Sequence, residues 1–407
     1  MLLPLTGLRG VAAYSVLLAH AIETFFVYRT GAPVLHGFDF RLASFGMSLF
    51  FTLSGFVLFF TYAERLTVAG RNLLREAYGF FVARFARLYP LYIFGLIVYA
   101  PHGLPPIFKH HRALELSYAT LTQSWFNAED AFFPPDWSIS TEWFFYLMFI
   151  PLSLLIVRIR RQKLALAIFC AVSIVAVYVI FGVFGTWLEG LVQQWLFGEP
   201  GISAPASFWL IYFDPPLRLL EFTAGMLAAN AYITHVVNPD RGRKSVAIAV
   251  VLSIAVLYCL SLISFGGTTE TGYVLKNIIS NFAFAPALSA LLLCVCLSRN
   301  WLHRVLSTGP FQFMGDISYS VYMWSFLVLR LFPPKPVEAD FKWRDAMPAL
   351  WDTGLEIALT TLLAYGSYHL VEAPARKWVR VALMGRWRSD IRIGRRAVIE
   401  RSPAELN

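Results

Sequence analysis

Residues 164–185, LALAIFCAVSIVAVYVIFGVFG, contain no charged side chain. An α-helix needs about 20 apolar residues to cross roughly 30 Å of hydrocarbon, and this run is long enough to do so. In lipid every backbone polar group must find a partner within the protein, so only helices and closed barrels span a membrane. The alternating pattern of barrel strands is missing from this run. The run therefore predicts a transmembrane helix in an all-α membrane fold.

The rest of the chain has the same character. Of its 407 residues 57% are apolar and 14% are charged, and the mean hydropathy is +0.59. Soluble domains carry about 25% charged residues, so the composition is typical of an integral membrane protein. Apolar runs separated by Pro, Gly or charge clusters predict a polytopic bundle of about ten transmembrane helices. The predicted spans are 7–27, 44–62, 84–100, 137–157, 164–184, 215–234, 246–265, 277–298, 311–331 and 351–371.

The distribution of Lys and Arg orients this bundle. With the N- and C-termini in the cytoplasm, the cytoplasmic loops and tail hold 21 Lys and Arg and the outer loops hold 8, which satisfies the positive-inside rule. We therefore expect a transmembrane domain at 1–375 and a basic cytoplasmic tail at 376–407. Basic clusters that flank spans usually set topology and bind anionic membrane lipids, so nucleic acid is not an expected partner.

The four cysteines do not indicate a disulfide framework or a metal site. Cys170, Cys259, Cys294 and Cys296 all fall within apolar runs. Cys294 and Cys296 are two residues apart on a predicted helix and so face different directions. We expect no bound metal.

Three ionisable residues lie in the outer half of the predicted bundle. The helical rise places His20 about 20 Å above the inner end of the first span and Glu142 about 8 Å below the outer surface, at a comparable depth. Glu23 is one turn beyond His20 on the same helix face and could hold the imidazole by a hydrogen bond. Ionisable side chains in hydrocarbon cost a few kcal/mol or more, which favours a functional role for His20 and Glu142.

Two further polar sets accompany them. Arg218 and Glu221 are one turn apart in the outer layer, and a structural ion pair is the favoured reading. Near the inner face, Arg84 and Arg87 share one helix face, which suits binding of phosphates or carboxylates. Arg9 lies in the same inner layer. A functional role for Arg9 and a side chain that merely snorkels to the membrane surface are equally favoured.

Seven motifs occur in a single order along the chain. They are LTGLRGVAAYSVLLAH (5–20), FGMSLFFTLSGFVLFF (45–60), RFARLYPLY (84–92), PPDWSISTEWFFY (134–146), RLLEFTAGM (218–226), MGDISYSVYMW (314–324) and YHLVEAPARKW (368–378). With these motifs the chain resembles the acyltransferase-3 family of membrane O-acyltransferases from end to end.

The resemblance implies a bacterial inner-membrane enzyme. Such an enzyme takes an acyl group, usually acetyl, from cytoplasmic acyl-CoA and places it on a hydroxyl of a glycan or lipid-linked sugar outside. Acetyl-CoA would be a substrate, with no permanently bound cofactor. The resemblance is to modifiers of exopolysaccharide, lipopolysaccharide and Nod factors, while other members act on macrolides or transfer succinyl groups.

The resemblance also implies roles for individual residues. Arg9, Arg84 and Arg87 would hold the CoA phosphates. His20 would act as general base on the acceptor hydroxyl, oriented by Glu23 or Glu142. A ping-pong route through an acyl-enzyme stays open. Candidate oxyanion or acceptor contacts are Ser54, Tyr319, Tyr322, Arg218 and Glu221.

Two positions depart from the family pattern. The usual acid before GLRG is Thr6, and the usual histidine near the end of the ninth span is Ser325, so neither can titrate here. Two alternative functions use the same intramembrane residues. One is a secondary transporter with a proton relay through His20, Glu23 and Glu142, although paired halves with broken helices are not evident. The other is an acyl-donor channel that serves a separate transferase.

Overall fold

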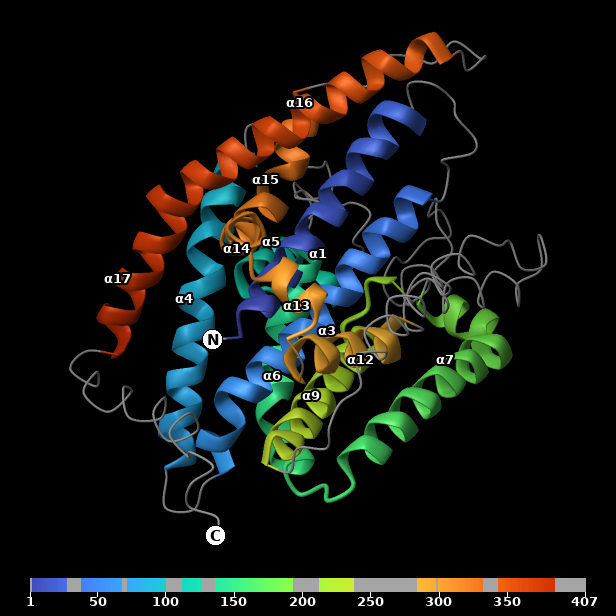
Figure 1. Ribbon diagram of the computed structural model, residues 1–407, viewed down its shortest axis with the longest axis vertical. Coiled ribbons are helices and arrows are strands. Elements are labelled where there is room, and N and C mark those ends of the chain that lie inside the picture. The colour runs from blue at the N-terminus through green and yellow to red at the C-terminus, as the bar shows by residue number, and fades with distance from the viewer. Residues whose placement is uncertain are drawn as a thin grey trace.

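The computed structural model describes residues 2–27, 38–67, 72–99, 112–125, 136–192, 212–237, 284–297, 299–331 and 343–384. Within these ranges every regular element is a helix, which confirms the all-α prediction (Figure 1). The elements are α1 Leu3–Ile22, η1 Glu23–Val27, α3 Phe38–Thr67, α4 Leu73–Tyr99, α5 Arg112–Thr120, η4 Gln123–Trp125, α6 Asp136–Ile156, α7 Gln162–Val192, α9 Pro215–Val237, α12 Phe284–Leu297, α13 Trp301–Leu306, α14 Gly309–Asp316, α15 Ser318–Arg330, α16 Trp343–Ser367, η6 Tyr368–Glu372 and α17 Ala373–Met384.

Apolar helices that could cross a membrane occur where the sequence predicts the first five spans. In the described part of the chain, five helical stretches are long and apolar enough: Leu3–Phe25, Arg41–Thr67, Leu73–Tyr99, Asp136–Ile156 and Gln162–Ile180. Helices α9 and α16 overlap the predicted sixth and tenth spans, although neither is among these five stretches. The predicted span 246–265, the beginning of 277–298 and Cys259 lie outside the described residues.

Several helices are longer than their predicted spans. Helix α4 begins eleven residues before the predicted span at 84, and α3 continues to Thr67. Hydropathy marks where a helix leaves hydrocarbon, whereas backbone hydrogen bonding continues into water wherever the sequence favours a helix. Short helices also occupy predicted loops, namely α5 and η4 before α6, and α13 before α14.

Helices α3 and α9 cross at the centre of the bundle with glycines in contact with the opposite backbone. A Cβ on Gly55 would lie 1.9 Å from the Phe222 carbonyl oxygen, and a Cβ on Gly225 would lie 1.9 Å from the Thr52 carbonyl oxygen. Small residues at such a crossing let two membrane helices approach closely and gain dispersion contacts. The crossing fixes the α3–α9 pair around which the other helices pack.

Gly225→Val is therefore expected to destabilise the bundle. The added side chain must separate two backbones, and overpacking of this kind costs about 1–3 kcal/mol or more. We expect a lower midpoint of thermal unfolding in detergent and a lower yield of monodisperse protein. Gly354→Val is the control, because no atom lies within 4 Å of a Cβ at that position. Equal midpoints for the two variants would contradict the close crossing.

The predicted ninth span at 311–331 is wrong as a single helix. The chain forms α14 and α15, which are separated at Ile317. Gly315 packs so closely on α1 that a Cβ would lie 2.0 Å from the Thr6 carbonyl oxygen. The break frees the Gly315 carbonyl oxygen, which accepts hydrogen bonds from Arg9 Nε (3.1 Å), Arg9 Nη2 (2.9 Å) and Ser318 Oγ (2.8 Å).

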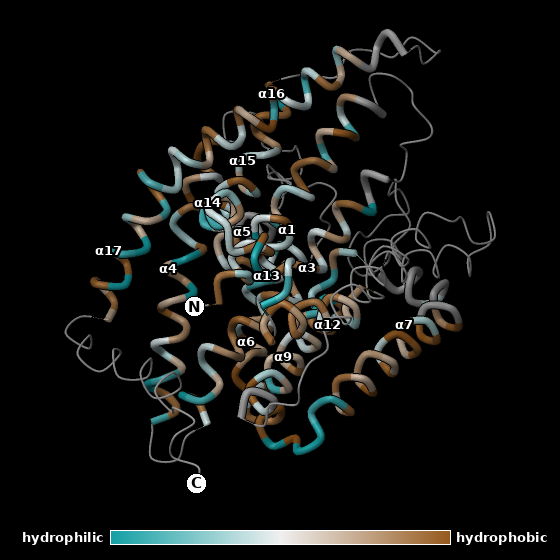
Figure 2. Tube along the Cα trace, viewed as in Figure 1, coloured by the Kyte–Doolittle hydropathy of each residue, from teal (hydrophilic) through white to brown (hydrophobic). Residues whose placement is uncertain are grey.

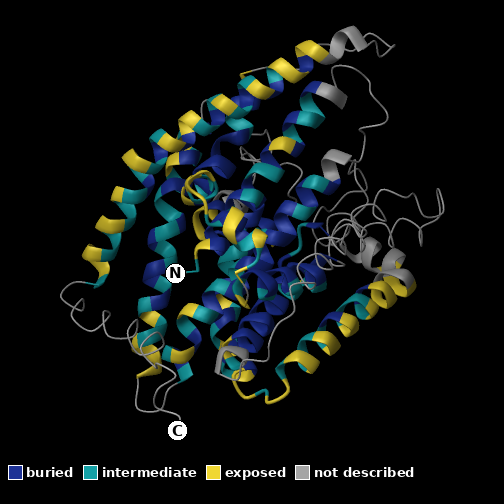
Figure 3. Cartoon of the chain, in the orientation of Figure 1, coloured by how far each residue is buried: buried dark blue, intermediate teal, exposed yellow. Residues whose placement is uncertain are grey.

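Two parts of the fold lie at its periphery. Helix α7 is apolar and exposed along its described outer side, and its most apolar window is only 11% buried within the protein (Figures 2 and 3). On the opposite side, α16, η6 and α17 form one continuous helical rod beside α4 (Figure 1). Tyr78 of α4 donates a hydrogen bond to the Leu383 carbonyl oxygen of α17 at 3.0 Å, which ties the two helices together.

Candidate active site

His20 lies at the C-terminal end of α1, which the predicted topology places on the outer side, at the point where the helix changes its pitch. Its Nδ1 is 3.6 Å from Glu23 Oε2, and the two side chains are 22% and 40% exposed. Glu23 begins the π-helical turn η1, a local widening that occurs often at functional sites. The imidazole ring packs on Phe326 of α15, with centroids 4.3 Å apart. The structure thus brings Glu23 to His20, as the spacing predicts.

Glu142 lies at a different depth from His20. Ser138 Oγ donates a hydrogen bond to Tyr322 Oη at 2.8 Å, which sets α6 level with α15. Glu142 is one turn inward of Ser138, whereas Phe326, the ring beside His20, is one turn outward of Tyr322. The helical rise separates His20 and Glu142 by on the order of 10 Å along the bundle. These contacts, of α15 with α1 through Phe326 and with α6 through Tyr322, do not support the expectation of a comparable depth.

Glu142 instead joins a network that leads towards the inner arginines. It accepts hydrogen bonds from Tyr146 Oη at 2.5 Å and Ser54 Oγ at 3.3 Å. The Arg84 guanidinium lies 5.9 Å from the Tyr146 ring centroid and 5.5 Å from that of Tyr62, and its Nη2 donates a hydrogen bond to Tyr62 Oη at 3.3 Å. Ser54, Glu142, Tyr146, Arg84 and Tyr62 therefore form one polar chain, here called the central network.

The inner arginines differ in how far they are already engaged. Arg9 binds the Gly315 carbonyl oxygen across the α14–α15 break. Arg84 leaves its Nε without a hydrogen-bond partner among the described residues. Arg87 lies within electrostatic range of Arg9 and Glu372. Arg84 therefore has a donor available to a ligand, while Arg9 has a structural role.

Two basic residues of α17 extend this inner layer, and the sequence reasoning missed them as site residues. Arg376 acts electrostatically on Arg9 and Glu372, and Arg380 lies close enough to Arg84, Arg87 and Tyr62 to feel their charges. The Nε of Arg380 has no hydrogen-bond partner in the described part of the chain. Glu372, Arg376 and Arg380 recur every four residues, so helical spacing placed them on one face and could have identified them.

Arg218 and Glu221 form a fully buried ion pair. Arg218 Nη1 is 3.2 Å from both carboxylate oxygens of Glu221, and both side chains are 0% exposed. Arg218 Nε also donates to the Tyr212 carbonyl oxygen at 2.6 Å, and Ser48 Oγ donates to Glu221 at 2.6 Å. The guanidinium lies 4.7 Å from the Tyr212 ring centroid. This arrangement joins α3 to α9 and fits the structural reading of the pair.

The candidate oxyanion donors have different hydrogen bonds. Ser54 donates to Glu142, and Tyr319 donates to the Leu88 carbonyl oxygen at 3.0 Å. Tyr322 accepts from Ser138, so its own hydroxyl hydrogen is not used in that bond. Ser325, at the position of the family's usual histidine, is buried and donates to the Tyr322 carbonyl oxygen at 3.0 Å. Tyr322 is thus the best placed of the three as a donor.

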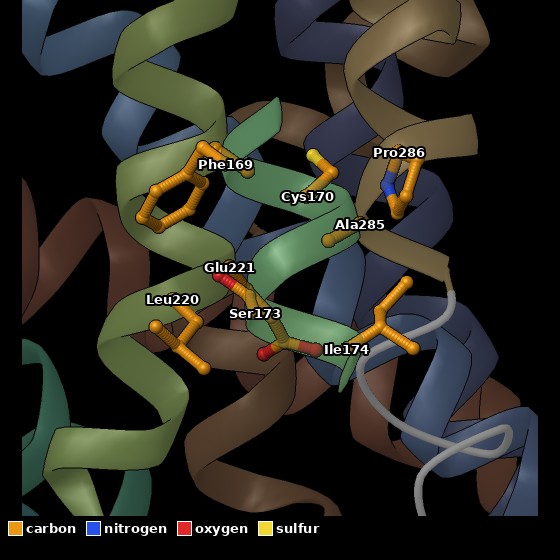
Figure 4. A pocket seen from close by; sticks show the side chains of 9 residues that line it. Phe169, Cys170, Ser173, Ile174, Leu220, Glu221, Ala285 and Pro286 are labelled. Atoms are coloured by element: carbon orange, nitrogen blue, oxygen red, sulfur yellow. The ribbon is translucent and has the colours of Figure 1, made fainter. Parts of the chain in front are cut away.

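A small pocket opens between α7, α9 and α12, away from His20. Phe169, Cys170 and Ser173 line it from α7, Leu220 and Glu221 from α9, and Ala285 and Pro286 from α12 (Figure 4). Its walls are mainly apolar. Across the described residues, no group of three His, Cys, Asp or Glu side chains is placed to hold a metal ion.

Comparison with known proteins identifies the family. A sequence profile described as an acyltransferase domain, of the acyltransferase-3 type, matches residues 4–364. The chain belongs to this family. The peptidoglycan O-acetyltransferase OatA of Listeria monocytogenes is 23% identical over 348 residues, 82% of this chain and 51% of the relative. The acyltransferase MdmB of Streptomyces mycarofaciens is 28% identical over 343 residues, 80% of this chain and 78% of the relative.

The chain spans about half the length of the Listeria relative. No solved structure matches the chain. With several helices apolar enough to cross a bilayer, the chain is a membrane protein of the acyltransferase-3 family.

Proposed function

We propose that the chain is a multi-pass O-acyltransferase of the bacterial inner membrane. It moves an acetyl group from cytoplasmic acetyl-CoA to a hydroxyl of a glycan or lipid-linked sugar on the outer face. Residues 1–375 would form ten spans, with both termini in the cytoplasm. Residues 376–407 would form a basic tail, of which 385–407 lie outside the described residues. Family membership and relatives named as O-acetyltransferases support this proposal.

The observation that carries the proposal is the His20–Glu23 pair. Because His20 Nδ1 faces the Glu23 carboxylate, Nε2 is the nitrogen available to a substrate. A carboxylate that holds Nδ1–H fixes the tautomer and stabilises the imidazolium that forms when Nε2 takes a proton. His20 is thereby equipped to act as general base on the acceptor hydroxyl. Glu142, which lies deeper, would serve the donor side through Arg84 rather than His20.

The inner arginines would bind the donor. Acetyl-CoA carries several phosphate charges, and Arg84, Arg87, Arg376 and Arg380 gather positive charge where α4 and α17 pack together. Guanidinium groups suit phosphates because their planar donors form paired, charge-assisted hydrogen bonds. The pantetheine arm would then extend between the helices towards His20, and Tyr322 would donate a hydrogen bond to the oxyanion. The sequential and acyl-enzyme routes both use this geometry.

Arg87→Ala is expected to raise KM for acetyl-CoA by about 10- to 100-fold with a small change in kcat. The lost charge-assisted hydrogen bond contributes about 1.5–3 kcal/mol to donor binding in both ground and transition states. Initial rates at varied acetyl-CoA concentration measure both constants. Arg158→Ala, at an exposed arginine after α6, is the control. An unchanged KM in Arg87→Ala would remove Arg87 from the donor site.

The test of the proposed function is the fate of the thioester. Purified protein in detergent is incubated with acetyl-CoA, with and without a crude glycan extract, and free thiol and acetylated glycan are measured. Thiol release that depends on glycan supports the transferase. Movement of acetyl-CoA or a proton across proteoliposomes without thiol release would favour the channel or the transporter.

A further inference from the structure

Helix α16 buries a carboxyl group that the proposed mechanism does not use. Glu356 is 0% exposed, and neither of its carboxyl oxygens has a hydrogen-bond partner among the described residues. Thr353, one turn before it, and Thr360, one turn after it, are also buried with unpartnered hydroxyls. Spacings of three and four residues place the three side chains on one face of α16, here called the α16 stripe.

An orphan stripe of this kind is costly. A buried polar group without a hydrogen bond costs about 1–3 kcal/mol, and an unpaired buried charge costs more. Packing alone does not favour three such groups on one helix face, because Leu or Val would fill the same volume without the cost of an unpaired polar group. Each unsatisfied buried polar group in a native structure needs an explanation, and a catalytic role is one of those that are known.

The position of the stripe can be fixed against α1, on which His20 lies. Ala349 of α16 packs in one apolar cluster with Ala21 and Phe25, near the outer end of α1. Further along α16, Thr361 Oγ1 and Tyr14 Oη lie 2.9 Å apart. The two helices are therefore antiparallel, and Glu356 lies between these contacts. That interval corresponds to residues 14–21 of α1 and contains His20.

Helix α15 joins the two groups. Phe326, which stacks on His20, also packs against the cluster that contains Ala349. Trp324 Nε1 donates a hydrogen bond to Ser367 Oγ of α16 at 2.7 Å. His20 and Glu356 thus belong to one packed unit of α1, α15 and α16. From the level of Ala349, Glu356 is displaced inward by seven residues, about 10 Å, towards the side from which a cytoplasmic donor would enter.

We propose that Glu356 is the proton donor to the thiolate that leaves the acyl donor. This inference rests on the proposed function. His20 accepts the proton of the acceptor hydroxyl while the hydroxyl oxygen bonds to the acyl carbon. The carbon–sulfur bond then breaks, its electron pair goes to sulfur, and sulfur takes the proton of the Glu356 carboxyl. After the products leave, His20 gives its proton to water and Glu356 takes one from water, so the products are the ester and the free thiol and the enzyme is unchanged.

This role explains why an acid occupies a dry site. A thiolate expelled among apolar helices has no water to solvate it, so a neighbouring acid lowers the barrier to its departure. The two threonines of the α16 stripe can hydrogen-bond to the carboxyl group or to the amides of the arriving donor arm. His20 and Glu356 would then divide the base and acid tasks between the two ends of the reacting thioester.

The experiment compares two donors that differ in the acidity of their thiol. Acetyl transfer by wild type and Glu356→Gln is measured with acetyl-CoA and with an acetyl ester of an acidic aryl thiol. Glu356→Gln keeps the shape of the side chain and removes its acid. We expect turnover with acetyl-CoA to fall about 100-fold, because general acid catalysis contributes at least that much. Turnover with the aryl thioester should fall less than about threefold, because its thiolate leaves without a proton.

Further variants keep the test independent of folding. Glu356→Leu removes a polar group from an apolar setting, so it should fold at least as well and share the defect with acetyl-CoA. Asp352→Asn, an acid-to-amide change at a partly exposed side chain one turn before Glu356, should behave as wild type. Equal losses with both donors, or full activity of Glu356→Gln, would overturn the proton-donor role alone. Wild type that transfers acetyl from neither donor would overturn the proposed function and this role with it.

Discussion

His20→Ala is expected to lower the rate of acetyl transfer by about 10³-fold without a comparable rise in KM for acetyl-CoA. General base catalysis contributes roughly 10²- to 10⁴-fold, and the His20 imidazole has a carboxylate partner in Glu23. The proposed donor site at the inner arginines is separate from His20, so its occupancy should not depend on His20. Transfer to glycan and thiol release, followed together under donor saturation, provide the measurement.

Two variants sharpen this result. His369→Ala removes an exposed histidine at the inner end of the bundle and should leave the rate unchanged. Glu23→Gln keeps a hydrogen-bond acceptor 3.6 Å from Nδ1 but removes the charge, so we expect a smaller loss than for His20→Ala. Normal turnover by His20→Ala would show that His20 is structural. The transporter and channel hypotheses would then be favoured over the transferase.

Arg218→Met is expected to be the most destabilising of the substitutions considered. It leaves the Glu221 carboxylate buried, with 0% exposure, and without its cation. Removal of one partner from a buried ion pair costs about 3–5 kcal/mol because the remaining charge is uncompensated. We expect a large fall in the midpoint of unfolding by heat in detergent, with little soluble protein at the growth temperature.

The double variant Arg218→Met with Glu221→Leu tests the cause. Replacement of both charges by apolar groups of similar size is often neutral or stabilising, so much of the lost stability should return. Recovery of stability together with normal acetyl transfer would show that the ion pair serves the fold and not the reaction. Recovery of stability without transfer would instead assign one of the two charges to the acceptor site.

Hydropathy and spacing predicted most of the described fold. Each apolar run that lies in the described residues became a helix, because a helix is the one open structure that satisfies its own backbone in lipid. The pairs His20–Glu23 and Arg218–Glu221 were predictable as well, since one helical turn brings each pair together. Local periodicity was sufficient for these features.

Register between helices was not predictable in the same way. The different depths of His20 and Glu142 depend on the contact between Ser138 and Tyr322, two residues far apart in sequence. The break at Ile317 depends on how closely Gly315 approaches Thr6, and the hydropathy of 311–331 gives no sign of it. Glu356 could not be identified from the sequence, because its lack of a hydrogen-bond partner depends on how the helices pack and not on its neighbours in the sequence.

The continuous rod of α16, η6 and α17 has a consequence for donor selection. Arg376 and Glu356 lie on one unbroken helical backbone, twenty residues apart. If donor phosphates bind at Arg376 and the thioester reacts at Glu356, the rod fixes the distance between the two sites and therefore the length of donor arm that can occupy both. Acyl groups on shortened carriers would then bind more weakly than acetyl-CoA and need higher concentrations for the same rate of transfer, however well their acyl chains fit.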